Sequence, residues 1–465
     1  MSACLMVLAA VLAGPAAGAN PPPNIIVFLA DDLGNGDVGC YGATDVRTPH
    51  IDALALAGVR FTNFYAPAPI CAPSRGAMLT GRSPERCGMS STRNVASELD
   101  APGLPGEEIT FAEVAKDKGY ATAVFGKWHL GSTFDCQPNA QGFDLFVGHH
   151  ASQIDSFSHM YYASDPWYHD LYRNRQEIFE DGVHMVDIIT REAMQFIDDA
   201  SGKPFLIYVS YNVPHYPMVA KTQFIEMYRD LPRLRRFHAA LVTMMDDSIG
   251  RIMARLRERG LTEKTFVLFT SDTGAPNRSL RGEGGGSNAP YREFKRSLFD
   301  GGGRVPAIAS WPAALPAGQT RDQLAVGMDV FSTIVDLVGA EPPAHRTIDG
   351  ISLLGPLKDP RRPGHEVLFF EWDNQHAVRS GPWKLLVNGL MDMYLGRQNR
   401  PESNSEDYLF LANTEDDPGE SVNLRGRHPD VVDRLLRMHA DWRRSVMADP
   451  TASPPFDTGR GGAGP

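Results

Sequence analysis

The sequence NIIVFLADD at residues 24–32 joins a short apolar run to two adjacent aspartates. A continuously apolar run of this length is typical of a strand that is buried on both faces of a parallel sheet. Asp31 and Asp32 follow the run directly, and neighbouring carboxylates repel each other unless a cation or hydrogen bonds hold them. The stretch therefore predicts a central strand that ends at a site for a hard, oxygen-binding metal such as calcium or magnesium. An Asx turn or a helix cap is the simpler alternative.

Three more apolar runs end in polar residues in the same way. The polar residues are Lys127 and His129 after residues 121–125, His215 after residues 205–210, and Asp272 after residues 265–270. In an open, mostly parallel α/β sheet, the carboxyl ends of the strands converge on one crevice. We therefore expect these polar residues to share one site with the aspartate pair.

Helical patterns separate the predicted strands. Residues 110–118 precede the strand at 121–125, and apolar residues recur at helical spacing over residues 186–197 and 241–256. The predicted fold class is α/β, with a large mixed, mostly parallel sheet sandwiched by helices. Downstream, the runs EVLFFEW, HAVRSGPWKLLV and YLFLAN and a helical pattern over residues 429–446 predict a smaller C-terminal antiparallel sheet packed by one helix.

Residues 69–82, PICAPSRGAMLTGR, place a cysteine, a proline and two arginines close together. Pro73 disfavours helical geometry at the preceding residue, so Cys71 is expected outside a helix that Ser74 caps. The positive end of that helix would face Cys71 and favour an anion. A cysteine phosphatase loop has its arginine six positions after the cysteine, whereas Arg75 stands four positions on. A buried structural cysteine is the plain alternative to a chemical role.

The motif CAPSR matches the CxPSR pattern of the sulfatases, and other stretches extend the resemblance. These are GNGDVGCYG, TPHIDALALAGVRFTNFY, KRSLFDGGGRVP at residues 295–306 and DPGESVNL at residues 417–424. Over nearly its whole mature length, the chain resembles the type I sulfatases of the alkaline phosphatase-like superfamily, which include arylsulfatases and N-acetylgalactosamine-6-sulfatases. The resemblance implies hydrolysis of a sulfate ester by a formylglycine, which a formylglycine-generating enzyme makes from the motif cysteine.

The resemblance also implies a role for each residue of the expected site. Cys71 would become formylglycine, whose hydrate carries two hydroxyls: one attacks sulfur, and the other later expels sulfate as the carbonyl forms again. Calcium, with magnesium as the alternative, would be held by Asp31, Asp32, Asp272, Thr273 and the modified Cys71. Arg75 would stabilise the ionised nucleophile, Lys127 and His215 would bind sulfate oxygens, His129 would handle the hydrate proton, and Lys295 would contact sulfate and help the leaving oxygen depart.

Two positions depart from the sulfatase pattern. Thr273 stands where an asparagine usually follows the metal-binding aspartate, and Asp300 stands where glutamate is usual. Because a threonine hydroxyl is a shorter and weaker ligand than an amide carbonyl, weaker calcium binding is expected. Two alternatives remain: a phosphodiesterase or phosphonate monoester hydrolase of the same superfamily, and a non-catalytic protein that binds sulfated glycans.

Length and charge limit the remaining possibilities. The chain has 465 residues and a net charge of -11, which argues against a nucleic-acid partner. Residues 1–19 indicate an export signal, and no later apolar run is long enough to span a membrane, so a periplasmic or secreted protein is predicted. The predicted organisation continues with a catalytic domain at 20–360, a C-terminal subdomain at 361–452 and a disordered tail at 453–465.

Three cysteines besides Cys4 and Cys71 remain for pairing. Cys40, Cys87 and Cys136 allow at most one internal disulfide, and the sequence does not say which.

Residues 142–173 are rich in histidine and tyrosine and lack clear periodicity. They are predicted to form an insertion beside the site that contacts substrate. A transition-metal site is the alternative, but the spacing of its candidate ligands matches no zinc pattern; these are His149, His150, Asp155 and His159. Exported sulfatases with such an insertion are similar to those that act on sulfated glycans, so a sulfated carbohydrate is the expected substrate. The sugar, the sulfate position, exo or endo action and the oligomeric state are left open.

Overall fold

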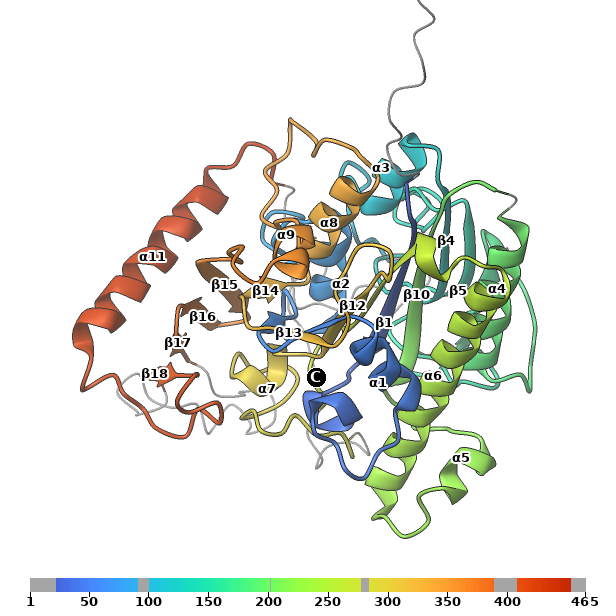
Figure 1. Cartoon of the computed structure of the whole chain (residues 1–465), viewed down its shortest axis with the longest axis horizontal. Coiled ribbons are helices and arrows are strands. Elements are labelled where there is room, and N and C mark those ends of the chain that lie inside the picture. The colour runs from blue at the N-terminus through green and yellow to red at the C-terminus, as the bar shows by residue number, and fades with distance from the viewer. Residues whose placement is uncertain (1–21, 91–99, 201, 277–283, 389–407, 453–465) are drawn as a thin grey trace, which may run out of the picture.

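A large sheet forms the centre of the molecule in the computed structural model, which describes residues 22–90, 100–200, 202–276, 284–388 and 408–452 (Figure 1). Within these residues, ten strands follow the order β13-β2-β12-β11-β1-β10-β4-β5-β8-β9. Their bounds are β1 Asn24–Asp31, β2 Val59–Phe61, β4 Ala121–Lys127, β5 Leu145–His149, β8 Tyr172–Arg173, β9 Gln176–Glu177, β10 Phe205–Pro214, β11 Thr265–Ser271, β12 Ala307–Ser310 and β13 Gln319–Arg321.

Strand β1 lies in the middle of this sheet and is buried on both faces, as its apolar run predicts. It pairs in parallel with β10 on one side and β11 on the other, and β4 and β5 continue the parallel part beyond β10. Ile25, Val27 and Leu29 pack into the core on one face of the sheet. Ile26 and Phe28 pack into the core on the opposite face. Because both faces of β1 are covered, all of its side chains are buried. This explains why apolar and polar residues do not alternate along the run.

Helices cover both faces of the sheet (Figure 1). One core holds residues of α2 Cys71–Thr80, α3 Phe111–Asp117, α8 Asp329–Leu337 and α9 Leu354–Lys358. The other core holds residues of α1 Pro49–Leu56, α4 Met185–Asp199, α5 Thr222–Glu226 and α6 Arg233–Glu258. The short elements are η1 Asn35–Asp37, η2 Gly39–Tyr41, η3 Thr262–Lys264, α7 Asp300–Gly303, β3 Phe64–Tyr65, β6 Met160–Tyr161, β7 Tyr168–His169 and β14 Ala325–Val326.

The C-terminal part forms the small antiparallel sheet that the sequence predicts. Its strands, β15 Val367–Trp372, β16 Gln375–Ser380, β17 Trp383–Val387 and β18 Leu409–Asn413, pair in sequence order. Helix α11 Pro429–Met447 packs Val431, Val432 and Leu435 against one face of this sheet, at the far side of the molecule from α4 (Figure 1). The predicted fold class is therefore confirmed.

The prediction for the start of α2 was wrong. Cys71 is the first residue of this helix, and Ile70, not Ser74, is its N-cap. Proline is tolerated in the first turn of a helix, where its missing N–H needs no partner. Pro73 therefore lies inside the first turn, and its bias against helix at the preceding residue is overridden. By contrast, α3 lies within residues 110–118, where the sequence predicts a helix, and it begins at a capping box between Thr110 and Glu113.

The segment at 142–173 is more regular than predicted. It begins with β5, whose residues pair in parallel with β4 and extend the main sheet. The rest forms the β6–β7 hairpin and the antiparallel strand β8, which pairs with β5. Only the part after β5 is therefore an insertion in the predicted sense.

Other sequence-based expectations concern covalent links and the chain ends. The cysteines in the described ranges, Cys40, Cys71, Cys87 and Cys136, are all free thiols. Among the helices described here, none is both long and apolar enough to cross a membrane. The expected export signal and C-terminal tail lie outside the described residues.

Candidate active site

The carboxyl ends of the central strands converge, as the repeated strand pattern predicts. Asp31 ends β1, Lys127 ends β4, His215 follows β10, and Asp272 follows β11. All four are buried, with at most 5% of their surface exposed. Parallel pairing of β1 with both β10 and β11 brings these ends together although the residues are far apart in sequence.

Each of the three aspartates is held by a cation. Lys127 Nζ donates to Asp31 Oδ1 and Oδ2 at 2.9 and 2.7 Å. Lys295 Nζ lies 2.7 Å from Asp32 Oδ1 and 2.8 Å from its Oδ2. Arg75 Nε donates to Asp272 Oδ2 at 2.8 Å. Three carboxylates thus face three cations, so the formal charges of these six side chains cancel.

The backbone around Asp32 is shaped to bring the carboxylates together. Asp32 has a φ of 69°, in the left-handed region that a non-glycine residue rarely adopts. In this conformation its N–H donates to Asp272 Oδ1 at 3.1 Å. Thr273 Oγ1 donates to Asp32 Oδ1 at 2.9 Å. The threonine therefore lies beside the aspartate pair, where the resemblance to sulfatases implies a metal ligand.

Helix α2 aims its N-terminus and Arg75 at the same point. Cys71 is buried at the start of the helix, and Arg75 follows one turn later. Arg75 Nη1 donates to Ser210 Oγ at 2.6 Å and to the Lys127 carbonyl at 3.2 Å. Among the described residues, Arg75 Nη2 is buried without a hydrogen-bond acceptor. It lies 3.6 Å from Asp31 Oδ1 and remains available to an anion.

The charges of the site strongly shift the pKa values of its side chains. Burial alone would raise the pKa of Asp31 and Asp32, but the cations around them, led by Lys127 and Lys295 respectively, hold both pKa values below the ordinary range. Burial alone would lower the pKa of Arg75 and Lys295. Asp272 beside Arg75 and Asp32 beside Lys295, with Cys71 close to both cations, raise them instead. Both cations therefore stay charged.

The two histidines of the predicted site are kept neutral. Burial, together with the charges of Lys127 and Arg75, holds the pKa of His129 well below its ordinary value. Burial lowers the pKa of His215 to about 4 although Asp31 and Asp32 oppose the shift. His215 Nε2 lies 3.6 Å from Asp32 Oδ2. In the described part of the chain, His129 Nδ1 has no hydrogen-bond partner, so a neutral ring offers a nitrogen that can exchange a proton.

Sequence reasoning missed one neighbour of the site, Ser210, and gave another, His149, only an alternative role as a transition-metal ligand. Ser210 on β10 accepts from Arg75 and donates to the Lys127 carbonyl at 2.6 Å, so it orients the arginine. His149 at the end of β5 is the register partner of Lys127, and burial lowers its pKa to about 3. The run LFVGH at residues 145–149, another apolar stretch that ends in a polar residue, was the signal that could have identified His149.

The alternative transition-metal group of His149, His150, Asp155 and His159 is not formed within the described residues. His149 contacts the Ala151 carbonyl through Nδ1, and Asp155 accepts hydrogen bonds from Phe157 and Ser158. The described residues contain no metal-binding group that combines His149, His150, Asp155 and His159. Strand pairing separates them, because His149 belongs to the main sheet and His159 precedes the β6–β7 hairpin.

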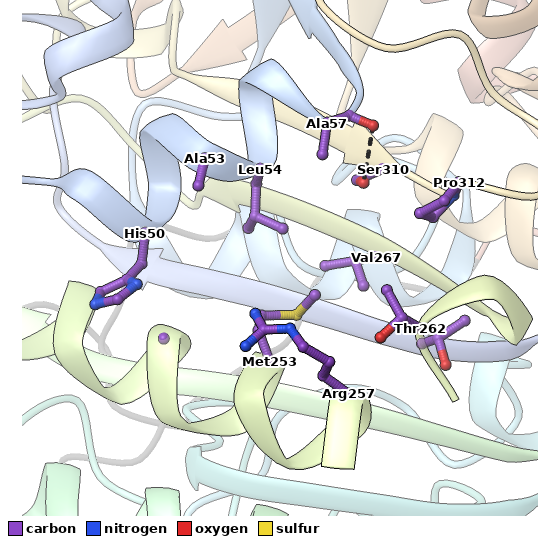
Figure 2. A pocket seen from close by; sticks show the side chains of 12 residues that line it. His50, Ala53, Leu54, Ala57, Met253, Arg257, Thr262, Val267, Ser310 and Pro312 are labelled. Carbon is purple, nitrogen blue, oxygen red and sulfur yellow. Dashed lines mark hydrogen bonds between the residues drawn. The ribbon is translucent and has the colours of Figure 1, made fainter. Parts of the chain in front are cut away.

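A cavity of about 190 Å³ lies away from this site, between α1 and the last turns of α6. Figure 2 shows its lining, in which Leu54, Met253 and Val267 present apolar atoms and Ser310 donates to the Ala57 carbonyl at 3.4 Å. Thr265 at the amino end of β11 also lines it. The cavity is thus near the opposite end of β11 from Asp272, and none of the active-site residues described above lines it.

Comparison with known proteins places the chain in one family. The family model described as "Sulfatase" matches residues 23–340, more than half of the chain. The chain is 35% identical to dog (Canis lupus familiaris) N-acetylgalactosamine-6-sulfatase over 394 residues, which cover 82% of this chain and 74% of that protein. It is 34% identical to human steryl-sulfatase over 423 residues, covering 75% and 72% of the two chains.

A solved structure agrees with these matches. The crystal structure of Ps i-CgsB in complex with k-i-k-neocarrahexaose superposes with a TM-score of 0.81 and 26% identity, covering 94% of this chain and 96% of that chain. The family model spans Asp31, Cys71, Lys127 and Lys295 alike, and these residues converge in the fold. The chain belongs to the sulfatase family and is a sulfuric ester hydrolase.

Proposed function

We propose that this sulfatase removes sulfate from a sulfated carbohydrate, with Cys71 converted to formylglycine as its nucleophile. The observation that carries the proposal is the cluster around the start of α2. There, Cys71 begins the helix that carries Arg75 and interacts electrostatically with both Arg75 and Lys295, and Arg75 Nη2, within the residues described, is buried without an acceptor. A buried donor without a partner is costly, and a sulfate oxygen would satisfy it.

The oxygen donors at the ends of β1 and β11 fit a calcium ion. Asp31 and Asp32 offer carboxylate oxygens at a site where Asp272 bonds to the Asp32 backbone, and Thr273 adds a hydroxyl. Calcium and magnesium prefer such oxygen ligands, and no thiolate competes for them. Asp31, Asp32, Asp272 and Thr273 would hold the ion, with the modified Cys71 completing the set. When bound, the ion supplies positive charge next to the nucleophile and the sulfate group.

The charge balance supports a divalent ion in the working enzyme. The three carboxylates and three cations cancel, and the two neutral histidines add nothing. A neutral cluster has little attraction for an anionic sulfate ester, whereas two added positive charges make the site electropositive where charge develops. A metal ion also needs deprotonated carboxylates, and the neighbouring cations keep Asp31 and Asp32 ionised.

The remaining residues bind the sulfate group and move protons. Lys127 and His215 come from adjacent strand ends and bind the sulfate group, with Lys127 Nζ as a donor to its oxygens. Neutral His129 accepts a proton at Nδ1 from the hydrate when sulfate is expelled. Because its neighbours raise the pKa of Lys295, this lysine stabilises the leaving oxygen by its charge and a hydrogen bond and keeps its own proton.

The substrate class rests on the relatives. N-acetylgalactosamine-6-sulfatase carries a sugar in its name, and the matched crystal structure was solved with a neocarrahexaose. Steryl-sulfatase, a comparably similar relative, supports a sterol sulfate as the competing substrate. A periplasmic or secreted location, following from the predicted export signal, would give access to sulfated polysaccharides.

The decisive experiment compares substrates on the mature enzyme. Protein made together with a formylglycine-generating enzyme is assayed on defined sulfated saccharides, a sterol sulfate, an aryl sulfate and an aryl phosphodiester. Turnover of a saccharide sulfate supports the proposal, whereas activity on aryl or sterol sulfates alone rejects the carbohydrate. A preference for the phosphodiester favours the phosphodiesterase or phosphonate hydrolase alternative.

Two measurements test the proposed chemistry itself. Peptide mass analysis should find an aldehyde or its hydrate at position 71, while an unmodified thiol would favour the non-catalytic glycan-binding alternative. Chelation should abolish turnover, and calcium should restore it. Restoration by zinc alone would overturn the calcium assignment.

A further inference from the structure

A second group of metal-ligating side chains lies in the insertion after β5. A ring nitrogen of His159, a ring nitrogen of His169 and a carboxylate oxygen of Asp181 lie within 4.8 Å of one another. The hairpin brings the histidines together: His169 ends β7, its register partner Met160 begins β6, and His159 is the residue before Met160. The Asp170 N–H donates to the His159 carbonyl at 2.9 Å and fixes this spacing.

Each of the two rings is oriented by an acceptor on one side only. His159 Nε2 lies 3.1 Å from the Val183 carbonyl, and His169 Nδ1 lies 3.0 Å from Glu177 Oε1. An oxygen acceptor at one ring nitrogen places the proton there, which leaves a lone pair on the other nitrogen. This arrangement, with one nitrogen bonded to a carboxylate or carbonyl and the other facing a metal, is the usual one for metal-binding histidines.

The two remaining ring nitrogens have nothing to bind. His159 Nδ1 and His169 Nε2 are buried and, in the part of the chain that the structure describes, lack a hydrogen-bond partner. His159 is fully buried, and only 10% of the His169 side chain is exposed. A buried polar atom without a partner costs about 1–3 kcal/mol, and each of the two rings has one such nitrogen.

The surroundings keep both rings in position. Burial and the nearby His169 lower the pKa of His159, so this imidazole is neutral, as a metal ligand must be. Phe179 stacks on the His169 ring at 4.5 Å with an interplanar angle of 21°. His159 is held at a φ of 55°, a strained conformation for a non-glycine residue that is common at ligand-binding positions.

We propose that His159 Nδ1, His169 Nε2 and the Asp181 carboxylate bind a divalent transition metal, with zinc as the best fit. Two imidazoles and one carboxylate suit zinc, whereas calcium prefers oxygen ligands. Asp181 is exposed, so the ion can enter from solvent and a water can take the fourth position.

The ion fastens the insertion to the segment that leads into α4. The Gly182 N–H, next to Asp181, donates to the Phe157 carbonyl at 2.8 Å, and the Met185 N–H donates to the Ser156 carbonyl at 2.8 Å. Asn212 on β10, three residues before His215, donates to Ser156 Oγ at 3.3 Å. Metal binding therefore stabilises a segment that contacts the strand leading to the active site, without itself supplying an active-site group.

Cobalt provides a probe whose visible absorption reports imidazole ligation. The full-length protein is stripped with a chelator, saturated with calcium and titrated with cobalt and then zinc. The wild type is expected to bind one cobalt ion that zinc displaces, and zinc should raise its unfolding temperature by mass action. His159→Gln and His169→Gln should lose the cobalt spectrum and the zinc-dependent rise, whereas His345→Gln, at an exposed histidine, should keep both.

A variant that leaves all three ligands in place guards against misfolding. Glu177→Ala removes only the acceptor that orients His169, and it should weaken cobalt affinity by roughly 10- to 100-fold. Absence of a cobalt spectrum in folded wild type would overturn the site. So would a spectrum that persists unchanged in His169→Gln, because the ion would then be bound elsewhere, for example at Asp31, Asp32 and His215. Unaltered affinity in Glu177→Ala would contradict the proposed orientation of His169.

Discussion

Two buried charge clusters in this protein look alike but differ in which polar atoms they leave without a hydrogen-bond partner. The active-site cluster joins three carboxylates to three cations at the strand ends. The second cluster, which we call the inter-sheet cluster, consists of Asp300, Arg304, Lys384 and Glu420 and links the segment between β11 and β12 of the main sheet to the small sheet. Lys384 Nζ on β17 lies 2.5 Å from Asp300 Oδ1 and 3.1 Å from Glu420 Oε1.

In the inter-sheet cluster, each side-chain nitrogen of Lys384 and Arg304 faces an acceptor within the described residues, and Glu420 Oε1, which accepts no hydrogen bond, lies 3.1 Å from Lys384 Nζ. Asp300 Oδ2 accepts from Arg304 Nη1 and from the Tyr65 hydroxyl, both at 3.1 Å, and the Asp300 N–H donates to Glu420 Oε2 at 2.6 Å. The active-site cluster instead keeps Arg75 Nη2 and, at its edge, His129 Nδ1 without partners among the described residues. Balanced charge is thus no sign of function by itself. Unpaired donors and neutral histidines beside the charges distinguish the site that receives a ligand.

Removing the nucleophile should give the largest effect that distinguishes the roles of the two clusters. Cys71→Ser should lose turnover by on the order of 10⁶-fold, because a serine hydroxyl cannot form the aldehyde hydrate, while the unfolding temperature changes little. Cys87→Ser, at another buried thiol, is the matched control and should keep its turnover per folded molecule. Full sulfatase activity in Cys71→Ser would show that the two-hydroxyl mechanism does not apply here.

Breaking the inter-sheet cluster should affect stability and leave the chemistry intact. Lys384→Met leaves Asp300 and Glu420 buried without their shared cation, which is expected to cost about 3–5 kcal/mol of unfolding free energy. Lys118→Met, at an exposed lysine, should cost almost nothing. Denaturant unfolding measures both variants. A Lys384→Met protein as stable as wild type, or one with normal stability but lost turnover, would contradict the structural role.

The inter-sheet cluster should also leave a trace in the pH dependence of stability. Burial and the nearby Asp300 raise the pKa of Glu420 from its ordinary 4.5 to about 7, although Lys384 opposes the shift. The folded protein then holds a proton that the unfolded chain releases above pH 4.5. The Glu420 contribution is therefore fully present below that pH and is lost as pH rises to 7, by roughly 2–3 kcal/mol.

Glu420→Gln provides the matched comparison for this titration, since its amide cannot ionise. Unfolding free energies measured between pH 4.5 and 7 should fall less steeply with pH in the variant than in the wild type. Parallel curves for the two proteins would show that Glu420 titrates normally in the folded state.

The smallest expected effect concerns the weakest proposed ligand in the active-site cluster. Thr273→Asn should supply a carbonyl oxygen in place of the hydroxyl that now donates to Asp32, and tighten calcium by up to about tenfold, or roughly 1.4 kcal/mol. Activity at limiting calcium should rise more than activity at saturating calcium. Thr222→Asn, at an exposed threonine, controls for the substitution. Identical calcium midpoints in Thr273→Asn and wild type would place position 273 outside the metal shell.

The sequence by itself determined the central strands and the polar residues at their ends. An uninterrupted apolar run such as residues 24–30 can be buried only between two covered faces, and parallel strands must end at a common edge. The resemblance around CAPSR then indicated the family and the expected roles of Cys71, Arg75 and Lys295. These inferences rest on local patterns, which is why the structure agrees with the sheet, the small C-terminal sheet and α11.

Only the tertiary structure decided which of these charges neutralise each other. Lys295 and Asp32 are 263 residues apart, and Arg75 and Asp272 are 197 apart, so no local pattern specifies their pairing. The helix start at Cys71 was missed because packing overrides the weak bias that Pro73 imposes on its neighbour. The pair His159 and His169 could not be read from spacing either, because their rings come together only after the β6–β7 hairpin has formed, and acceptors on β9 and in the segment before α4 then fix the rings.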